Sequence, residues 1–246
     1  MNTSTIAAVT MSRLVSRQEV AEHTVALRFE KPPGWEFQAG QFLEMTLVDP
    51  SETDAEGDTR AFSIASAPRE ATLMVATRLR DSAFKREVTK MPLGALVTIA
   101  GPSGDLTLDR NANCPAVFLA GGIGITPFRS MVFHAANEKI LQHIFLFYSN
   151  RRPEDAPFLD ELQALEKSNP NYKLITSMTK MEQSHRPWHG ETGLIDEAML
   201  ARYLKDLVSP VYYIAGPPAM VQGLHTMIRQ AGIAAVAIRT EEFAGY

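Results

Sequence analysis

The stretch Ala116–Pro127 most constrains the fold, because an uncharged apolar run leads directly into glycines and a helix start. The apolar run predicts a strand buried on both faces. Gly122 and Gly124 allow a tight turn that a ligand can approach closely. Thr126 is expected to cap the following helix, and Pro127 suits its first position. Free N–H groups at a positive helix end predict a phosphate site. An ordinary strand-to-helix turn is the alternative, since Pro127 replaces the third fingerprint glycine.

The C-terminal part alternates between apolar runs and helical stretches, which predicts a parallel sheet with helices on both faces. The expected strands are 116–120, 142–149, 172–177, 211–215 and 235–239, and the expected helices lie near 127–137, 155–167, 196–207 and 217–231. Ligands bind such sheets at the carboxyl ends of the strands. We therefore expect the glycine turn, residues 148–151 and residues 215–218 to line one crevice.

The N-terminal part consists of short alternating segments separated by turn signals, which predicts a small antiparallel barrel. Its expected strands are 24–29, 41–48, 60–66, 72–79 and 95–100, with a helix-like stretch over 82–91. The polar, turn-rich segment 109–113 is a candidate boundary. The sequence thus predicts two domains: an antiparallel β-barrel over 1–110 and an α/β domain over 111–246.

Composition excludes several classes of protein. Hydrophobic residues make up 45% and charged residues 21% of the 246 positions, as in globular domains. No apolar run approaches the roughly 20 residues of a membrane helix, and no signal-peptide pattern is present. The net charge of -4 argues against general nucleic-acid binding. The single cysteine excludes an internal disulfide and an all-cysteine iron–sulfur site. We expect a cytoplasmic monomer. We also expect no metal site, because Pro187 would break a helix between His185 and His189.

The segment 60–66 is the unusual strand of the barrel. Alternation puts Arg60 and Phe62 on one face and Ser63 on the other. A guanidinium can bind a phosphate through two parallel hydrogen bonds, and an aromatic side chain offers a flat surface to a ring. From the residues alone, a surface arginine and a core phenylalanine are the favoured explanation of the pattern.

The whole chain resembles the ferredoxin–NADP reductase family, in which a flavin-binding barrel precedes a nicotinamide-nucleotide domain. Four motifs in the family's order carry the resemblance. They are Arg60-x-Phe62-Ser63 for its Arg-x-Tyr-Ser flavin motif, Gly122 to Pro127 for its Gly-x-Gly-x-x-Pro loop, Ala215-Gly216-Pro217 for its Cys-Gly-Pro motif, and the tail 241–246.

The resemblance implies an FAD-dependent oxidoreductase that transfers hydride between NAD(P)H and flavin. Arg60 and Ser82 would bind the FAD pyrophosphate, Phe62 would pack on or beside the isoalloxazine, and Ser63 would hydrogen-bond flavin N5. The other implied cofactor contacts are Ala61, Thr77, Gly122, Gly124, Thr126, Pro127, Ala215, Gly216 and Pro217.

The sequence departs from the family pattern at two positions. Phe62 replaces a tyrosine, which removes a hydroxyl from the flavin site, and Ala215 replaces the cysteine placed near the nicotinamide. In the tail, Glu242 is either a proton donor near N5 or a solvated charge. Phe243 or Tyr246 is expected to stack over the flavin until the nicotinamide displaces it.

Nucleotide choice depends on the end of the second strand of the C-terminal sheet. NADH-dependent proteins usually place an acidic residue there. Here the strand is followed by the segment Ser149-Asn150-Arg151-Arg152. These four side chains supply hydrogen-bond donors and positive charge for a 2′-phosphate. The sequence therefore favours NADP(H), with NAD(H) and a solvated basic turn as the alternatives.

The expected electron acceptor is a ferredoxin or a flavodoxin-like carrier. A basic patch would bind such an acidic partner, and its candidate residues are Arg78, Arg80, Lys85, Arg86 and Lys90, although a solvated helix face explains them too. The alternatives are a reductase of free flavin, ferric chelates or quinone, and a non-catalytic subunit that senses flavin or nucleotide.

Overall fold

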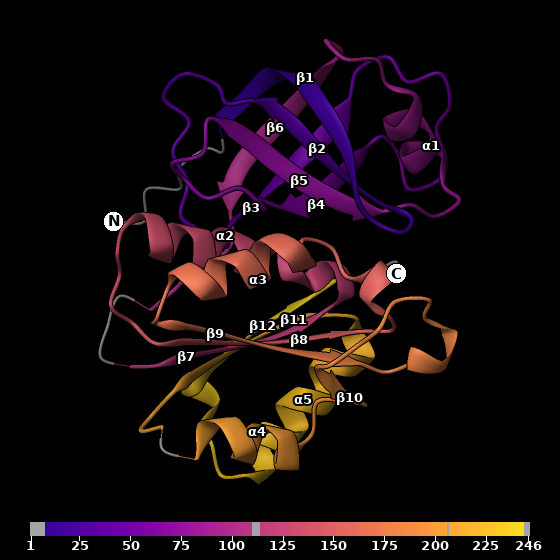
Figure 1. The fold of residues 1–246 in the computed structure, drawn as a ribbon. Coiled ribbons are helices and arrows are strands. Elements are labelled where there is room, and N and C mark those ends of the chain that lie inside the picture. Colours follow the sequence, from indigo (N-terminus) through magenta and orange to yellow (C-terminus); the bar gives the residue numbers. More distant parts are fainter. Residues whose placement is uncertain (1–7, 110–113, 206, 244–246) are drawn as a thin grey trace.

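The computed structural model describes residues 8–109, 114–205 and 207–243, which form two stacked parts (Figure 1). The N-terminal strands form one part and the C-terminal strands and helices the other. Helices α2 (Ile125–Asn137) and α3 (Leu159–Ser168) lie between the two sheets in Figure 1. The two parts therefore meet along these two helices.

The first part is an antiparallel barrel of six strands in the order β4-β3-β6-β1-β2-β5. The strands are β1 (Ala8–Ala21), β2 (Thr24–Glu30), β3 (Phe42–Leu47), β4 (Thr59–Ser63), β5 (Thr72–Arg78) and β6 (Leu96–Ser103). Just past β4, the N–H of Ala65 donates to the carbonyl of Met74 at 2.7 Å, which brings the two edge strands together. Helix α1 (Ala83–Lys90) covers one end. The predicted barrel is confirmed.

Strand β1 was not predicted from the sequence, although it pairs with both β2 and β6. Its apolar side chains Val9 and Met11 are 69% and 51% exposed, whereas Ser12 is buried and donates its hydroxyl proton to the carbonyl of Glu30. Two register shifts interrupt its pairing with β2. Near the start of β1 the apolar side chains face outward and a polar one faces inward, and further along the register shifts break the alternation between the two faces. The usual pattern of apolar-in and polar-out residues is therefore missing from its sequence.

The second part is a parallel sheet in the order β10-β9-β8-β7-β11-β12, as predicted. The strands are β7 (Ala116–Gly121), β8 (Ile144–Asn150), β9 (Tyr172–Met178), β10 (Glu191–Thr192), β11 (Val211–Gly216) and β12 (Ile238–Glu242). Helices α4 (Glu197–Leu204) and α5 (Pro218–Gln230) cover the face opposite α2 and α3. Short 3-10 helices occupy Gly122–Gly124, Pro153–Asp155, Met181–Gln183 and Ala235–Ala237.

The last strand of the second part begins later in the sequence than expected, and this difference matters for the site. The last strand, expected over 235–239, begins only at Ile238, and residues 235–237 form a 3-10 helix. Glu241 and Glu242 therefore belong to a strand of the sheet rather than to a tail. Their backbones are paired with Ala215 and Gly216 of β11.

Three apolar clusters stabilise this arrangement. One fills the barrel and one lies between the sheet and helices α4 and α5. The third crosses the junction, since Met74 and Ala65 of the barrel pack in the same cluster as Phe118 and Phe128. Burial of apolar surface in a shared cluster holds the two parts in a defined orientation.

The predicted boundary between residues 110 and 111 lies outside the described residues. The last barrel strand ends at Ser103 and the first strand of the parallel sheet begins at Ala116. The division into 1–110 and 111–246 stays a prediction.

Candidate functional site

The carboxyl ends of neighbouring parallel strands meet at one edge of the sheet. Strand order places the glycine turn after β7 between the ends of β8 and β11. Gly121 is in register with Ser149, and Ala120 with Ala215. The three segments therefore lie at one edge of the sheet, next to β12 with Glu241, and the crevice they are expected to line stays a prediction.

The glycines of the turn have two different roles. Gly122 has φ +53°, and a Cβ built there meets nothing within 4 Å, so its outer side is open to a ligand. Gly124 is in contact with the neighbouring loop: a Cβ there would lie 2.3 Å from the carbonyl oxygen of Ala215. Gly122 is therefore needed for its positive φ, whereas Gly124 is needed because its missing side chain lets the Ala215 backbone approach closely.

The predicted helix cap is wrong. Helix α2 begins at Ile125 with Gly124 at its N-cap, and no side chain caps it. The Thr126 hydroxyl lies inside the helix and donates to the carbonyl of Ile123 at 3.0 Å. Because the 3-10 turn Gly122–Gly124 runs directly into α2, the helix starts before Thr126. Pro127 still lies in the first turn, where a missing N–H costs nothing.

A cavity of about 1080 Å³ opens where the barrel meets β12. Its lining comes from β3, β4, the segment after β6 and the C-terminal strand, namely Phe42, Arg60, Ala61, Phe62, Ser63, Gly104, Asp105, Leu106, Thr107, Arg239, Thr240, Glu241, Glu242 and Phe243. Residues far apart in sequence thus surround one space. The cavity brings together Arg60 to Ser63 with Glu242 and Phe243, as predicted from the sequence, whereas Tyr246 lies outside the described residues.

A hydrogen-bonded pair, in which Ser63 is buried and Glu241 half-buried, lies in the wall of this cavity. The Ser63 hydroxyl donates to Glu241 Oε1 at 3.1 Å, and Ser63 is only 4% exposed. Burial raises the pKa of Glu241, and the hydrogen bond from Ser63 opposes the rise in part. The pair can therefore hold a proton at the cavity wall.

Of the two adjacent carboxylates, Glu241 is the one that contacts Ser63, while the role expected for Glu242 stays a prediction. Glu242 lines the cavity but is exposed and accepts a hydrogen bond from Gln222 at 3.4 Å. Glu241 was missed, although alternation along a strand would have shown that neighbouring side chains point to opposite faces. That signal was unusable because the strand was placed too early in the sequence. Phe243 follows, with its N–H bonded to the carbonyl of Gly216.

Arg60 and Phe62 share a face of β4, as alternation predicts. Both approach Phe84 of α1, with ring centroids 5.9 Å apart for Phe62 and the Arg60 guanidinium 5.0 Å from the Phe84 centroid. Arg60 Nη2 pairs with Glu56 at 2.9 Å and Asp54 at 3.5 Å. The guanidinium is thus held in place beside the acidic loop 49–58.

The start of α1 carries the second predicted pyrophosphate contact. Ser82 is the N-cap, and its hydroxyl accepts the N–H of Lys85 at 3.4 Å, so the predicted capping role is confirmed. The N–H of Ala83 donates to Asp54 Oδ2 at 3.0 Å. Thr77 is buried outside the cavity lining, with its hydroxyl 3.5 Å from the carbonyl of Arg78.

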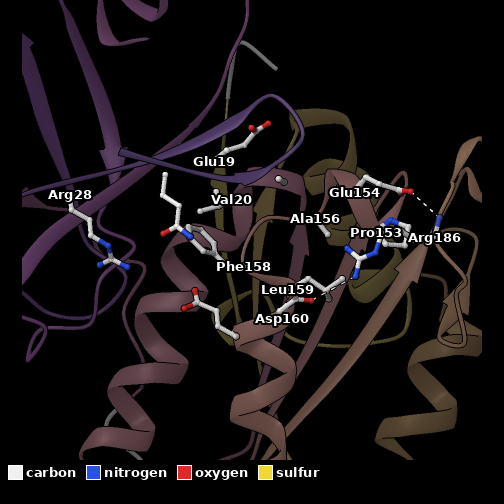
Figure 2. A pocket seen from close by; sticks show the side chains of 13 residues that line it. Glu19, Val20, Arg28, Pro153, Glu154, Ala156, Phe158, Leu159, Asp160 and Arg186 are labelled. Atoms are coloured by element: carbon white, nitrogen blue, oxygen red, sulfur yellow. Dashed lines mark hydrogen bonds and ion pairs between the residues drawn. The ribbon is translucent and has the colours of Figure 1, made fainter. Parts of the chain in front are cut away.

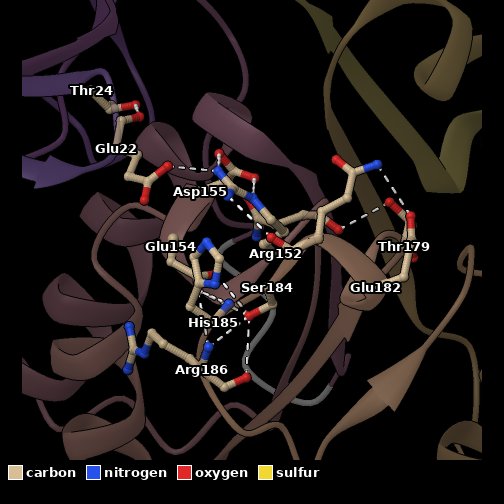
Figure 3. Close-up of polar contacts among 12 residues, drawn as sticks. Glu22, Thr24, Arg152, Glu154, Asp155, Thr179, Glu182, Ser184, His185 and Arg186 are labelled. Carbon is tan, nitrogen blue, oxygen red and sulfur yellow. Dashed lines mark hydrogen bonds and ion pairs between the residues drawn. The ribbon is translucent and has the colours of Figure 1, made fainter.

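The basic turn after β8 is not uniformly available to a ligand. Arg152 binds Asp155 through Nε and Nη2, at 2.9 and 3.0 Å, and Glu22 of the barrel at 2.6 Å (Figure 3). This arginine connects the two parts of the molecule, so its predicted contribution to a phosphate site is not supported. Asn150 is buried, at 7% exposure.

Two exposed cations remain at this edge. Arg151 follows β8, and its carbonyl accepts the N–H of Lys180, which follows β9, at 2.8 Å. Both residues are exposed. Lys180 was missed in the sequence because only strand pairing brings it beside Arg151. The nearby Glu154 accepts the Ser184 hydroxyl and the N–H groups of His185 and Arg186 (Figure 3).

The predicted basic patch contains several internal ion pairs. Arg78 pairs with Asp155 at 3.5 Å, Arg86 with Glu52 at 2.7 Å, and Lys90 with Glu52 at 3.4 Å. Burial, the largest effect, and nearby Arg80 lower the pKa of Lys85. The net positive potential of this surface is smaller than the count of its cations implies.

A second pocket, of about 310 Å³, lies at the junction between β1 and the start of α3 (Figure 2). Val20 lies on the barrel side, and Ala156, Phe158 and Leu159 on the other side. It shares no lining residue with the cavity at Ser63.

Among the described residues, no group of three or more histidine, cysteine or acidic side chains gathers as a metal site. None of the described helices is long and apolar enough to cross a bilayer.

Comparison with known proteins agrees with this architecture. The family profile described as "Oxidoreductase NAD-binding domain" matches residues 118–226. Ferredoxin–NADP reductase B of Sorangium cellulosum is 28% identical over 229 residues, covering 89% of this chain and 90% of that protein. One component of the Na(+)-translocating NADH-quinone reductase of Methylococcus capsulatus is 29% identical over 76% of this chain, and the match spans only 49% of that component.

A solved structure has the same fold. The ferredoxin NADP+ reductase of Neisseria gonorrhoeae, determined with bound FAD and NADP, superposes with a TM-score of 0.77 at 21% identity, covering 95% of this chain and 98% of that one. The matched relatives are named as reductases, and the Neisseria structure shares the two-part fold described above. The chain is therefore similar in sequence and in fold to reductases of the ferredoxin–NADP reductase family, and its C-terminal part matches an oxidoreductase NAD-binding domain.

Proposed function

We propose that the protein is an FAD-dependent oxidoreductase that takes hydride from NADPH and passes electrons to a ferredoxin or flavodoxin-like carrier. The observation that carries the proposal is the cavity lined by Arg60 to Ser63, with the hydrogen-bonded Ser63–Glu241 pair in its wall. It adjoins the edge of the parallel sheet that bears the glycine turn, since β12 is paired with β11 and β11 with β7. Two ring systems bound at these places would meet near Ser63.

The donors present fit the phosphate end of FAD. Arg60 and the N–H of Ala83 converge on one anion, the Asp54 carboxylate, at 3.5 and 3.0 Å. That contact supports the proposal that the arginine and the helix start form a cradle suited to negative charge. At the other end, Phe62 and the backbone of 61–63 offer an apolar wall to a planar ring.

When bound, the flavin would supply the hydride and electron chemistry. The chain would bind and orient the rings and exclude water from between them. The single hydroxyl proton of Ser63 would turn from Glu241 to flavin N5 when the flavin binds, and Glu241 in its protonated form would donate to the Ser63 oxygen and hold it in the orientation this requires. The half-buried carboxyl of Glu241 would thereby hold the proton that accompanies transfer. Phe243, the residue after β12, would cover the ring where the nicotinamide has to enter.

NADPH is favoured over NADH by the two exposed cations at the strand ends, Arg151 and Lys180. A phosphate bound between them would gain charge-assisted hydrogen bonds of about 1.5–3 kcal/mol each, and even one of them corresponds to about ten- to a hundredfold in affinity. Arg151→Ala should raise the KM for NADPH by at least tenfold and leave the KM for NADH nearly unchanged. Arg202→Ala, at a distant exposed ion pair, serves as the control.

A second acceptor class is favoured by the ion pairs between α1 and the loop 49–58. Because Arg86 and Lys90 both pair with Glu52, the positive charge they offer an acidic protein is reduced, and the alternative acceptors are free flavin, ferric chelates or quinone. Changing Lys85 and Arg86 to glutamate separates these acceptors. Lost ferredoxin reduction with unchanged reduction of a neutral dye supports the protein carrier, whereas parallel rates for both acceptors support the small molecule.

The decisive experiment is an anaerobic visible spectrum of the purified protein with NADPH and, separately, NADH. A yellow protein bleached rapidly by NADPH and slowly by NADH supports flavin, hydride transfer and the role of Arg151. A protein that keeps its flavin but is not reduced by either nucleotide supports the sensor alternative. A protein that stays colourless after incubation with FAD refutes the proposal.

A further inference from the structure

The acidic loop 49–58 between β3 and β4 lies directly on the cradle proposed for the flavin phosphate. Asp54 contributes both carboxylate oxygens to it: Oδ2 accepts the N–H of Ala83 at 3.0 Å and Oδ1 lies 3.5 Å from Arg60 Nη2. Glu56 adds a contact of 2.9 Å between its Oε2 and the same Nη2. These are the groups that would bind a phosphate.

The loop is built to hold this position. Asp54 Oδ1 also accepts the N–H of Glu56 at 3.0 Å, and its main-chain carbonyl accepts the N–H of Gly57 at 2.9 Å. Arg60 Nη1 in turn donates to the carbonyls of Glu56, Gly57 and Thr59 at 2.8 to 3.0 Å. The turn around Asp54 and the arginine thus stabilise each other.

Two anions cannot share this cradle, because their charges repel at such distances. With the carboxylate in place, one N–H at the start of α1 and one arm of the guanidinium are already used. A flavin phosphate has to displace the carboxylate before it can form the same contacts. The free energy of the internal pair is then subtracted from the free energy of flavin binding.

We propose that Asp54 is an internal competitor for the flavin phosphate and sets the affinity of the protein for its flavin. This inference depends on the proposed function, since it assumes that a flavin phosphate binds at Arg60. It adds that the chain itself weakens that binding and speeds flavin release. The competition acts only on flavins that carry a phosphate, so riboflavin should be unaffected.

The test compares Asp54→Asn with the unaltered protein. Asparagine keeps the shape and the Oδ1 acceptor of the turn but removes the charge. The dissociation constants for FAD, FMN and riboflavin are measured by flavin fluorescence on the full chain after its flavin has been removed. We expect FAD to bind about tenfold more tightly, the size of one charge-assisted hydrogen bond, with slower release. FMN should follow FAD, and riboflavin should not change.

Glu87→Gln is the matched control, because Glu87 binds the same loop through Ser51 at 2.6 and 2.9 Å without touching the cradle. It should leave all three constants unchanged. Arg60→Ala separates this inference from the proposed function. If that variant binds FAD as well as the unaltered protein, no phosphate binds at Arg60. If it binds FAD more weakly while Asp54→Asn equals the unaltered protein or is weaker, the competition alone is refuted.

Discussion

Arg129 of α2 is the charged side chain whose removal should destabilise the fold most. It is 3% exposed. Its guanidinium donates to the carbonyl of Ala65 at 2.7 Å, to Glu70 at 2.9 Å and to both oxygens of Glu161. The rings of Phe133 and Phe158 lie 4.5 and 5.3 Å from it. Burial, the largest effect, lowers the pKa of Arg129, but these carboxylates outweigh it and raise the pKa overall.

The magnitude follows from what Arg129→Ala leaves behind. Two carboxylates would face each other across the junction, and the carbonyl of Ala65 would lose its cationic donor. Removing one partner of a buried pair costs about 3–5 kcal/mol. Glu161 is 36% exposed, so water can compensate in part and we expect the lower end, about 3 kcal/mol. For a chain of this size that lowers the Tm by about 6–12 °C.

The assay is urea and thermal unfolding of three variants followed by circular dichroism. Arg129→Lys keeps the charge without the planar fork, and we expect an intermediate loss. Arg202→Ala removes an exposed pair with Glu191, a change of about 0–1 kcal/mol. An Arg129→Ala protein that loses no more stability than Arg202→Ala would show that the junction does not depend on this cluster.

Two further outcomes follow from the site. Burial raises the folded-state pKa of Glu241 above its ordinary value of 4.5, so the stability that the protonated carboxyl contributes is complete below 4.5 and is lost as pH rises through the folded pKa. Glu241→Gln should therefore flatten the fall of the unfolding free energy over this pH range, measured by unfolding at a series of pH values. An unchanged slope would contradict this reasoning. Gly124→Ala should abolish nucleotide binding, measured by calorimetry, because its Cβ would lie 2.3 Å from the Ala215 oxygen. Gly223→Ala, inside α5 with open space around it, should bind normally and gain about 0.5–1 kcal/mol of stability.

Secondary structure was largely predictable because hydrophobic periodicity is local. The strands around Val117 and Ile214 and the helix capped by Ser82 lie where their patterns place them. The exceptions have local causes: β1 exposes its apolar residues and shifts register, and Thr126 lies inside a helix that begins at a glycine turn.

The sequence by itself determined the fold class, the two-part order and the position of the glycine turn. Tertiary structure decided which charges are free to act, since an ion pair depends on residues distant in sequence. It assigned Arg152 to Glu22 and Asp155, placed Lys180 beside Arg151, and chose Glu241 over Glu242 as the partner of Ser63. Periodicity reports which face of an element is buried, whereas the partner of a charge is set only when the elements pack.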